Sequence, residues 1–331
     1  MRRRQFISLA GGAVVAWPFE VWAQQTKRLP IVALVGVAPT PVADISGSDP
    51  VRPWARAFVH GLRDLGWIDG RTVIIEPRIT EPKAAPDILR EMVERSADVI
   101  VVGGARWLHD AARAATPAIP IVTLFQDDPV KGGLIASMSR PGGNLTGVAQ
   151  TTGPEFFAKR LQLLLEIAPN ASRVALVGPR GVLEQFRPVA LPAGISVAPI
   201  ELEVAEQFDA AFAAILDGKS DALMVSGSAL TYNAGNIKRV VAFAAGNRLP
   251  AIHGYREAVD AGGLLSYGTS IPGIYGQMAI MVARFLGGAK AGDVPAETPT
   301  RFELVVNLKT AKTLGLSVSP AFLARADEVI E

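Results

Sequence analysis

The stretch Ile119–Val148, IPIVTLFQDDPVKGGLIASMSRPGGNLTGV, decides the fold. It begins with a short apolar run, 121–125, that is rich in β-branched residues and therefore predicts a buried parallel strand. Asp128 and Pro129 then indicate a helix start, because an acidic side chain caps free N–H groups and proline suits the first helical position. We expect a short helix over Val130–Ser139, behind the strand.

A tight turn at 140–144, RPGGN, follows this helix, and residues 145–148 predict one more short strand. The stretch therefore predicts the end of one lobe, part of a cleft wall and the approach to a hinge. On both sides of it, apolar runs alternate with helical patterns along the chain. This alternation predicts an α/β protein with parallel sheets that carry helices on both faces.

The second half of the chain repeats the plan of the first. The run VALVG at 32–36 recurs at 174–178, and DVIVVG at 98–103 is echoed by DALMVSG at 221–227. Because the echoes keep the same order, we favour two similar lobes; one large sheet with recurrent strand chemistry is the alternative. The remaining residues are too few for a third lobe, so the lobes should share them and the chain should cross the hinge more than once.

The C-terminal tail reads differently from either lobe. Residues 301–307 alternate like a partly exposed strand, and we expect helices over Leu308–Gly315 and Pro320–Val329.

The N-terminus has the three parts of a secretory signal peptide, residues 1–23. Arg2–Arg4 is the charged start, Phe6–Trp17 is the apolar centre, and Val21–Ala23 has the small-x-small cleavage pattern. RRQFI at 3–7 also resembles the twin-arginine export signal, so the general and twin-arginine routes both stay open. We expect export to the periplasm and a mature chain that begins near Gln24.

Composition narrows the function classes. The 331 residues suggest about two domains of ~150 residues each. Formal net charge is +2, and removal of residues 1–23 takes away three arginines and one glutamate, which leaves zero. A near-neutral chain argues against nucleic-acid binding. The absence of cysteine excludes disulfides, thiolate metal sites and cysteine nucleophiles.

Few residues suggest catalysis. His60, His109 and His253 are far apart and form no HExxH pair, and the chain has no GxSxG elbow and no P-loop lysine motif. Asp127 and Asp128 are either a carboxylate pair or a cleft residue beside a helix cap, and we favour the second interpretation. We therefore expect no enzyme activity, no metal and no cofactor.

Candidate binding residues follow from position, because ligands of open α/β sheets bind beyond the carboxyl ends of the strands. These ends also hold glycines, which let backbone N–H groups approach a ligand, and serines, which supply hydrogen-bond donors. Tyr267 is added because it should lie near a hinge crossing. The predicted set is Pro39, Thr40, Gly104, Ala105, Arg106, Trp107, Phe125, Gln126 and Asp127 in the first lobe, and Arg180, Ser226, Gly227, Ser228, His253 and Tyr255 in the second.

Two sharper hypotheses concern this set. Arg106 and Arg180 follow echoed strands of opposite lobes, so they could grip a carboxylate between them; two solvated loop arginines are the alternative. Trp107 follows Gly103–Gly104 at the lip of a central strand, where an aromatic ring could stack on a ligand as the lobes close. The alternative is that Trp107 packs under its own helix.

The ordered set of motifs resembles a known family across most of the chain after the leader. The chain resembles a type I periplasmic binding protein and is similar, more narrowly, to the ABC transporter substrate-binding proteins in the group with tryptophan- and tyrosine-binding members. It departs from the commonest family forms at the cleft loops 104–107 and 124–127. The matching segments are GWIDGRTVIIE at 66–76, IPIV at 119–122, DPV at 128–130, RPGGNLTG at 140–147, KRL at 159–161, YRE at 255–257, AGGLLSYG at 261–268 and FELVVNLKTA at 302–311.

The resemblance implies two Rossmann-like lobes joined by a three-crossing hinge, with a small molecule held between them and no reaction. We place the first lobe in residues 28–148 and 262–298 and the second in 149–261 and 299–331. The implied function is a periplasmic receptor, expected to be a monomer, that captures a carboxylate, aromatic or amino-acid-like solute for the permease of an ABC importer. An exported sensor module for a membrane signalling protein and, less favoured, an exported enzyme are the alternatives.

Overall fold

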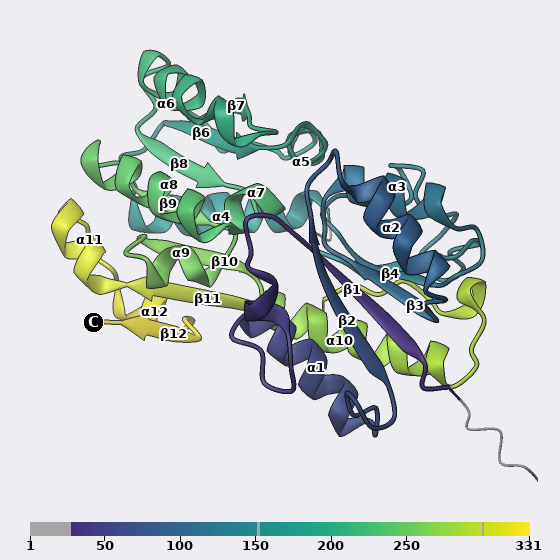
Figure 1. Cartoon of the computed structure of the whole chain (residues 1–331). Coiled ribbons are helices and arrows are strands. Elements are labelled where there is room, and N and C mark those ends of the chain that lie inside the picture. The colour runs from purple at the N-terminus through teal and green to yellow at the C-terminus, as the bar shows by residue number, and fades with distance from the viewer. Residues whose placement is uncertain (1–27, 151–152, 300) are drawn as a thin grey trace, which may run out of the picture.

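Two β-sheets organise the chain, as the alternation of strands and helices predicts (Figure 1). The computed structural model describes residues 28–150, 153–299 and 301–331, so the predicted leader lies outside the described residues. The first sheet is entirely parallel, in the order β2-β1-β3-β4-β5. Its strands are β1 (Ile31–Val37), β2 (Ile74–Thr80), β3 (Val99–Val102), β4 (Ile121–Phe125) and β5 (Leu145–Ala149).

The second sheet has the order β12-β11-β10-β9-β8-β6-β7. All its neighbours are parallel except β10 and β11, which run antiparallel. Its strands are β6 (Arg173–Gly178), β7 (Ser196–Glu201), β8 (Ala222–Val225), β9 (Ala251–His253), β10 (Leu265–Thr269), β11 (Phe302–Asn307) and β12 (Glu328–Ile330).

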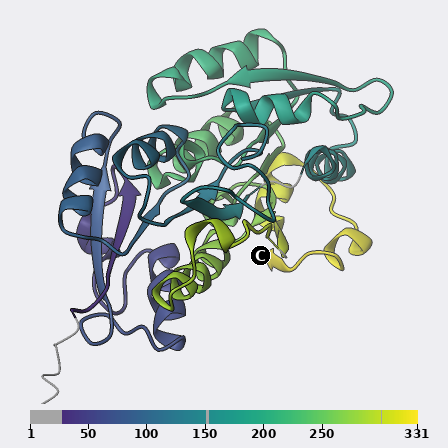
Figure 2. The same ribbon diagram turned by 90° about the vertical axis from the view of Figure 1, so that its right-hand side faces the viewer.

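Helices cover both faces of the first sheet. Alternate side chains of each strand point to opposite faces, so one set packs on α1 and α10 and the other on α2 and α3. Helices α1 and α10 lie side by side although they are far apart in sequence (Figure 2). The helices are α1 (Pro53–Asp64), α2 (Ala85–Glu94), α3 (Arg106–Ala115) and α10 (Ile271–Leu286).

The second sheet is covered in the same manner. One face packs on α4, α11 and α12, and the other packs on α6 and α8. The helices are α4 (Pro154–Ile167), α5 (Arg180–Phe186), α6 (Phe208–Asp217), α7 (Ala229–Tyr232), α8 (Ala234–Gly246), α9 (Arg256–Asp260), α11 (Leu308–Leu314) and α12 (Pro320–Leu323). Short 3-10 turns lie at Val42–Ile45, Ala205–Gln207 and Ala291–Asp293.

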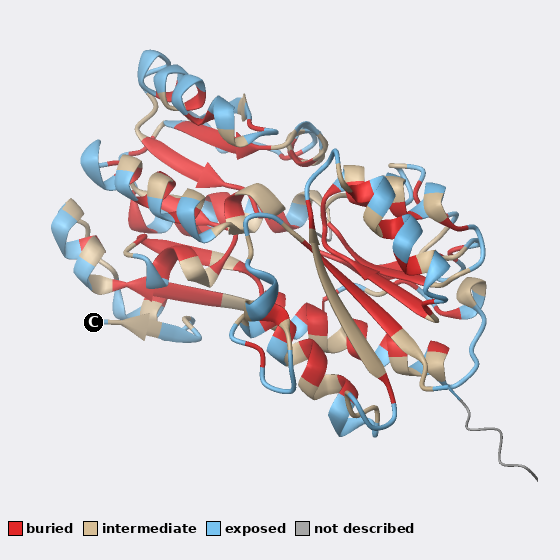
Figure 3. Cartoon of the chain, viewed as in Figure 1, coloured by how far each residue is buried: buried red, intermediate tan, exposed pale blue. Residues whose placement is uncertain are grey.

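Burial explains the strand sequences. Strands β3, β4 and β8 are buried at every residue, because helices cover both of their faces (Figure 3). The parallel edge strands β2 and β7 are more exposed, and each carries a proline, Pro77 and Pro199. These prolines pair with Leu34 and Leu176 of the echoed VALVG runs. Proline cannot donate a ladder hydrogen bond, so both edges are protected in the same way against pairing with a strand of another chain.

The chain crosses between the sheets three times. It leaves the first sheet after β5, returns between β10 and α10, and leaves again before β11. The predicted lobe boundary at 262 needs one adjustment, because β10 is hydrogen bonded to β9 and β11 in the second sheet. We propose that the first lobe resumes after Thr269. No helix among the described residues is long and apolar enough to cross a membrane.

The predicted helix Val130–Ser139 is wrong. Asp128 caps one turn, since its carboxylate accepts hydrogen bonds from the N–H groups of Val130 at 3.0 Å and Lys131 at 3.1 Å. The chain then turns at Gly132–Gly133, where Gly133 has a φ of 69° that ends helical geometry. Asp128 therefore caps a single turn, in agreement with the favoured interpretation, but no helix follows that turn.

The predicted helix Pro320–Val329 is wrong after its first turn. Helix α12 ends at Leu323, a turn follows, and Glu328–Ile330 form β12. Asp327 ends the connection, because its carboxylate accepts a hydrogen bond from the N–H of Leu304 in β11 at 2.9 Å. Three residues of strand are too short to show a periodicity, so only the pairing with β11 defines this element.

The packing of β4 on β5 leads to a stability prediction. A Cβ atom on Gly147 would lie 1.8 Å from the carbonyl oxygen of Thr123, which is backbone and cannot rotate away. We expect Gly147→Ala to lower the free energy of unfolding by about 3 kcal/mol, measured by urea denaturation. Gly143→Ala is the matched control, since no heavy atom lies within 4 Å of its added Cβ. Equal losses in the two variants would contradict this packing.

Candidate ligand-binding cavity

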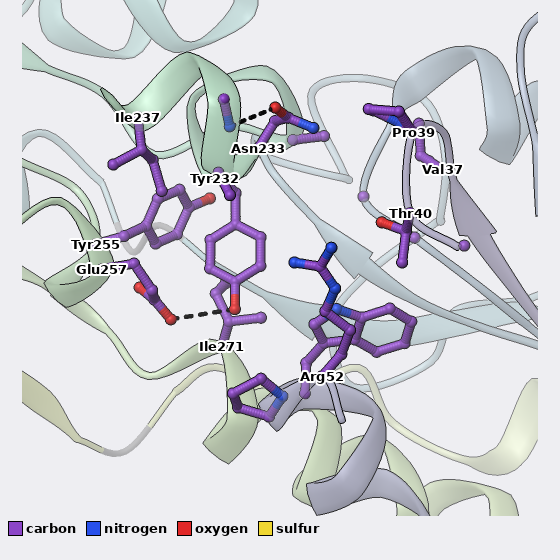
Figure 4. A pocket seen from close by; sticks show the side chains of 18 of the residues that line it. Val37, Pro39, Thr40, Arg52, Tyr232, Asn233, Ile237, Tyr255, Glu257 and Ile271 are labelled. Atoms are coloured by element: carbon purple, nitrogen blue, oxygen red, sulfur yellow. Dashed lines mark hydrogen bonds between the residues drawn. The ribbon is translucent and has the colours of Figure 1, made fainter. Parts of the chain in front are cut away.

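A cavity of 640 Å³ opens between the two lobes (Figure 4). Neither lobe forms it alone, because each contributes about half of the lining. The first lobe provides Gly36, Val37, Ala38, Pro39, Thr40, Arg52, Pro53, Trp54, Gly103, Gly104, Leu124, Gln126, Ile271 and Tyr275. The second provides Ala229, Tyr232, Asn233, Ala234, Gly235, Ile237, Lys238, Tyr255, Glu257, Asp260 and Ala261.

The carboxyl ends of parallel strands form the floor on the first-lobe side. Residues 36–40, 103–104, 124 and 126 follow or end β1, β3 and β4, which are neighbours in the sheet. The start of α1 and the first turns of α10 complete this half. On the other side, the lining comes from α7, α8 and α9 and from Tyr255, which lies between β9 and α9. The volume suits a small organic molecule.

Aromatic rings from both lobes line the cavity. Trp54 of α1 and Tyr275 of α10 are tilted by 41° with ring centroids 4.6 Å apart. Across the cavity, Tyr232 and Tyr255 meet edge to face at 4.9 Å and 70°. Tyr232 packs against the hydrophobic cluster of the first lobe, although it belongs to the second. Flat apolar walls of this kind favour a ligand with an aromatic or extended apolar group.

Glu257 places a partly desolvated carboxylate in the lining. The hydroxyl of Tyr232 donates a hydrogen bond to its Oε1 at 3.1 Å (Figure 4). Burial raises the pKa of Glu257 above the usual range of a glutamate. Among the described residues it makes no ion pair within 4.0 Å, whereas Asp260, the other acid of the lining, lies 3.6 Å from Arg256. The cavity therefore offers a carboxylate with unused acceptor capacity.

Positive charge reaches the cavity from both lobes, through Arg52 and Lys238. Arg52 immediately precedes α1, and its Nε lies 3.2 Å from Oδ2 of Asp44. That contact fixes the guanidinium, whose tip extends towards the middle of the cavity in Figure 4. Lys238 lines the cavity from an exposed position on α8. Asn233 is occupied as the α8 cap, since its Oδ1 accepts hydrogen bonds from the N–H groups of Gly235 and Asn236.

The structure brings five of the predicted residues into the lining: Pro39, Thr40, Gly104, Gln126 and Tyr255. Ser226 and His253 line a much smaller adjoining cavity, of 10 Å³, with Tyr255 between the two spaces. That volume is about the space that one water needs. Gly227 also touches the wall, because it packs against Gln150 and Tyr255.

The predicted arginine clamp is not formed in this structure. Arg180 makes two hydrogen bonds to Glu201, at 3.0 and 3.1 Å, and Arg106 pairs with Asp110 at 3.2 Å. Arg106 also donates to the carbonyl of Gly132 at 3.1 Å. Neither guanidinium lines the cavity. Arginines on exposed helix starts take the nearest acids, which here lie one helical turn away or on the adjacent strand.

Trp107 is also placed outside the cavity lining. It packs against the hydrophobic cluster between the first sheet and helices α2 and α3, which was the alternative interpretation. Tyr267 stacks on Phe156 and Phe302, with both pairs of centroids 5.8 Å apart. The other predicted residues outside the lining are Ala105 and Phe125, which are buried in the first lobe, Asp127, which lies against Gly181, and Ser228, which caps α7.

The sequence interpretation missed most of the charged and aromatic lining. Tyr232 ends the short helix that follows Ser228, and Asn233 is the next residue, so a longer window after β8 would have included both. Glu257 lies two residues after Tyr255 and could have been found in the same way. Tyr275 gives no local signal, because only the packing of α10 on the first sheet brings it here.

Two buried histidines contribute no charge to the site. Burial lowers the pKa of His109 to about 4 and that of His253 to about 3. Both imidazoles are therefore neutral at pH 7. Within residues 28–150, 153–299 and 301–331, no group of three or more His, Asp or Glu side chains could hold a metal ion.

Comparison with known proteins gives a consistent result. A family model described as ABC transporter substrate binding protein matches residues 47–330. A protein from Clostridioides difficile named tyrosine-binding protein is 24% identical over 269 residues, which are 79% of this chain and 76% of that protein.

Two solved structures share the fold. One is a conserved domain protein from Vibrio cholerae, with a TM-score of 0.79 and 24% identity over 91% of this chain and 100% of its own. The other is an ABC domain from Streptococcus pneumonia in complex with L-Trp, with a TM-score of 0.79 and 21% identity over the same shares. At these identities the likeness concerns the arrangement of lobes and sheets.

The position of Trp54 in the cavity wall predicts a fluorescence signal. A chain that begins at Gln24 has three tryptophans, Trp54, Trp67 and Trp107. We expect a ligand that enters the cavity to change the emission of Trp54, which is only 8% exposed beside Tyr275. Trp107→Phe should keep the signal in a titration and Trp54→Phe should lose it. The reverse pattern would restore Trp107 as the reporter.

Proposed function

This chain belongs to the family of ABC transporter substrate-binding proteins, and we propose on that premise that it captures a small solute between its lobes for import. The solute is handed to the permease of an ABC importer in the inner membrane. The observation that supports this most strongly is the cavity itself, which takes its lining from both lobes and lies at the carboxyl ends of strands. The family is one of solute-binding proteins, so we propose capture and release without a chemical step.

The ligand chemistry follows from the lining. The rings of Trp54, Tyr232, Tyr255 and Tyr275 suit an aromatic or extended apolar group. Glu257 lacks an ion pair among the described residues, so a protonated amine is the group that would complete it. These features together support an aromatic, amino-acid-like solute.

A carboxylate on the same solute would have a separate partner. Arg52 faces the cavity from the first lobe, on the other side from Glu257 (Figure 4). Opposite charges on opposite lobes would hold a zwitterion across the cleft and favour the closed arrangement. The names of two similar proteins, a tyrosine-binding protein and an L-Trp complex, agree with this class. In this proposal Arg52 replaces Arg106 and Arg180 as the carboxylate partner.

Export is part of the proposal, because an importer receptor must meet its solute outside the inner membrane. The leader-like residues 1–23 support it by their charged start, apolar centre and small-x-small end. A single receptor chain with both lobes can close on a ligand by itself, so we propose that it acts as a monomer.

The leader gives a direct prediction about the mature protein. We expect mass spectrometry of the protein from its own cells to give a chain that starts near Gln24, recovered in the periplasmic fraction. Replacement of Arg3 and Arg4 by lysine separates the routes, because twin-arginine export requires both arginines and general secretion does not. A full-length chain in the cytoplasmic fraction would contradict export.

The proposed amine contact predicts the effect of Glu257→Gln. Isothermal titration with L-tryptophan and L-tyrosine should show binding to the wild type that is weaker by roughly 10- to 100-fold in this variant. Asp260→Asn is the matched control, because Asp260 lines the cavity but is paired with Arg256. An unchanged affinity in Glu257→Gln would remove the amine contact.

The same contact has a pH dependence with a definite sign. An ammonium ligand needs the ionised form of Glu257, and burial raises the pKa of this carboxyl. Binding should therefore be strongest above the raised pKa of Glu257, and the affinity should fall as the pH is lowered through that pKa. Glu257→Gln should flatten this part of the profile.

A thermal-shift screen of amino acids, aromatic acids and short carboxylates tests the wider function, since a ligand at 100 times its Kd adds about 2.7 kcal/mol of stability.

A further inference from the structure

Gln150 holds a special position at the first crossing between the lobes. It directly follows β5, and its backbone N–H donates to the carbonyl oxygen of Phe125 in the first sheet at 2.7 Å. The backbone of Gln150 is therefore still part of the first lobe. The next described element is α4, which packs on the second sheet. Gln150 is 4% exposed, so its amide is removed from solvent.

The side chain of Gln150 reaches the second lobe. Its Nε2 donates a hydrogen bond to the hydroxyl oxygen of Tyr255 at 2.8 Å. It passes directly over Gly227, where an added Cβ would lie 2.4 Å from Nε2 and 3.1 Å from Cζ of Tyr255. The contact thus requires a glycine at the end of β8. Both partners are buried, so water does not compete for the bond.

Tyr255 connects this bond to the cavity. Its ring lines the cavity and meets the edge of Tyr232 at 4.9 Å. The hydroxyl of Tyr232 in turn donates to Glu257. A continuous set of contacts therefore runs from the first crossing, through two rings of the cavity wall, to the partly buried carboxylate of Glu257.

We propose that Gln150 is a positioning residue that links the angle between the lobes to the aromatic wall of the cavity. Rotation of the lobes about the crossing moves the backbone of Gln150 relative to the end of β9. The bond to Tyr255 therefore restricts that rotation and, at the same time, fixes the Tyr255 ring against which a solute packs. A solute that holds the Tyr255 ring in place favours the lobe angle at which this bond is intact, because it interacts differently with the two arrangements.

The first test needs no ligand. The chain contains no cysteine, so Glu94→Cys on α2 and Ala213→Cys on α6 provide two exposed, unique positions for spin labels on opposite lobes. We expect Gln150→Leu to broaden the distance distribution measured by electron–electron double resonance. Tyr255→Phe removes the same bond from the other side with little change in volume and should broaden it equally. The two changes together should add nothing further, because they remove one interaction.

Thr146→Val is the matched control. Thr146 lies in β5, four positions before Gln150, and its buried Oγ1 donates to the carbonyl of Val294 at 3.0 Å without bridging the lobes. Thr146→Val should lower the stability, because a buried hydrogen bond is lost, and it should leave the distance distribution between the lobes unchanged. Gln150→Glu should restore the narrow distribution, since a carboxyl oxygen can accept from the Tyr255 hydroxyl in place of the donated bond.

A second test uses L-tryptophan as the probe and rests on the proposed function. Gln150→Leu should weaken its binding by about five- to tenfold, and Tyr255→Phe should do the same. If L-tryptophan does not bind the wild type, the proposal of an amino-acid ligand is wrong. The spin-label distances measured without ligand still test the role of Gln150. Unchanged distances in Gln150→Leu and Tyr255→Phe, or an equal change in Thr146→Val, would overturn the proposal.

Discussion

Parallel strands place all of their carboxyl ends at one edge of a sheet, and this constraint determines where the molecule can bind anything. In each lobe the backbone groups at that edge have left the ladder and are available to contacts outside the sheet. The chain joins the two sheets so that these edges face a common space, and three crossings lie beside it. The cavity is therefore a consequence of topology, and the side chains that line it determine what it binds.

In the second lobe, one buried arginine binds the carbonyl groups of two neighbouring strands. Arg160 of α4 is fully buried and donates to the carbonyl oxygens of Val225 and Ile252 at 2.5 and 3.2 Å. Burial lowers the pKa of Arg160 to about 9, and the two carbonyl groups take the place of a carboxylate partner.

Most of the fold could be predicted from the sequence because burial on two faces leaves an unmistakable pattern. Strand β4 is short, apolar and rich in β-branched residues, and it was predicted from that pattern; β3 and β8 are the short apolar runs that echo each other at 98–103 and 221–227. The prediction of a helix after Pro129 was wrong, because the Asp128 cap was given more weight than the two glycines that follow it. Strand β12 was not predicted, because a strand of three residues is defined only by its pairing with β11. The site was harder: three residues named by the rule about strand ends, Thr40, Gly104 and Gln126, line the cavity, but the rule said nothing of α7, α9 and α10, whose placement depends on tertiary packing.

The central claim is that a small solute with an amine and an aromatic group occupies the cavity between the lobes. Mass spectrometry of the small molecules released when the protein from its own cells is denatured tests this most directly. The account predicts one compound of this chemistry in near one-to-one ratio with the chain, and its loss from a Glu257→Gln protein prepared in the same way. Recovery of the same compound in equal amount from both proteins, or of a compound without an amine, would contradict it.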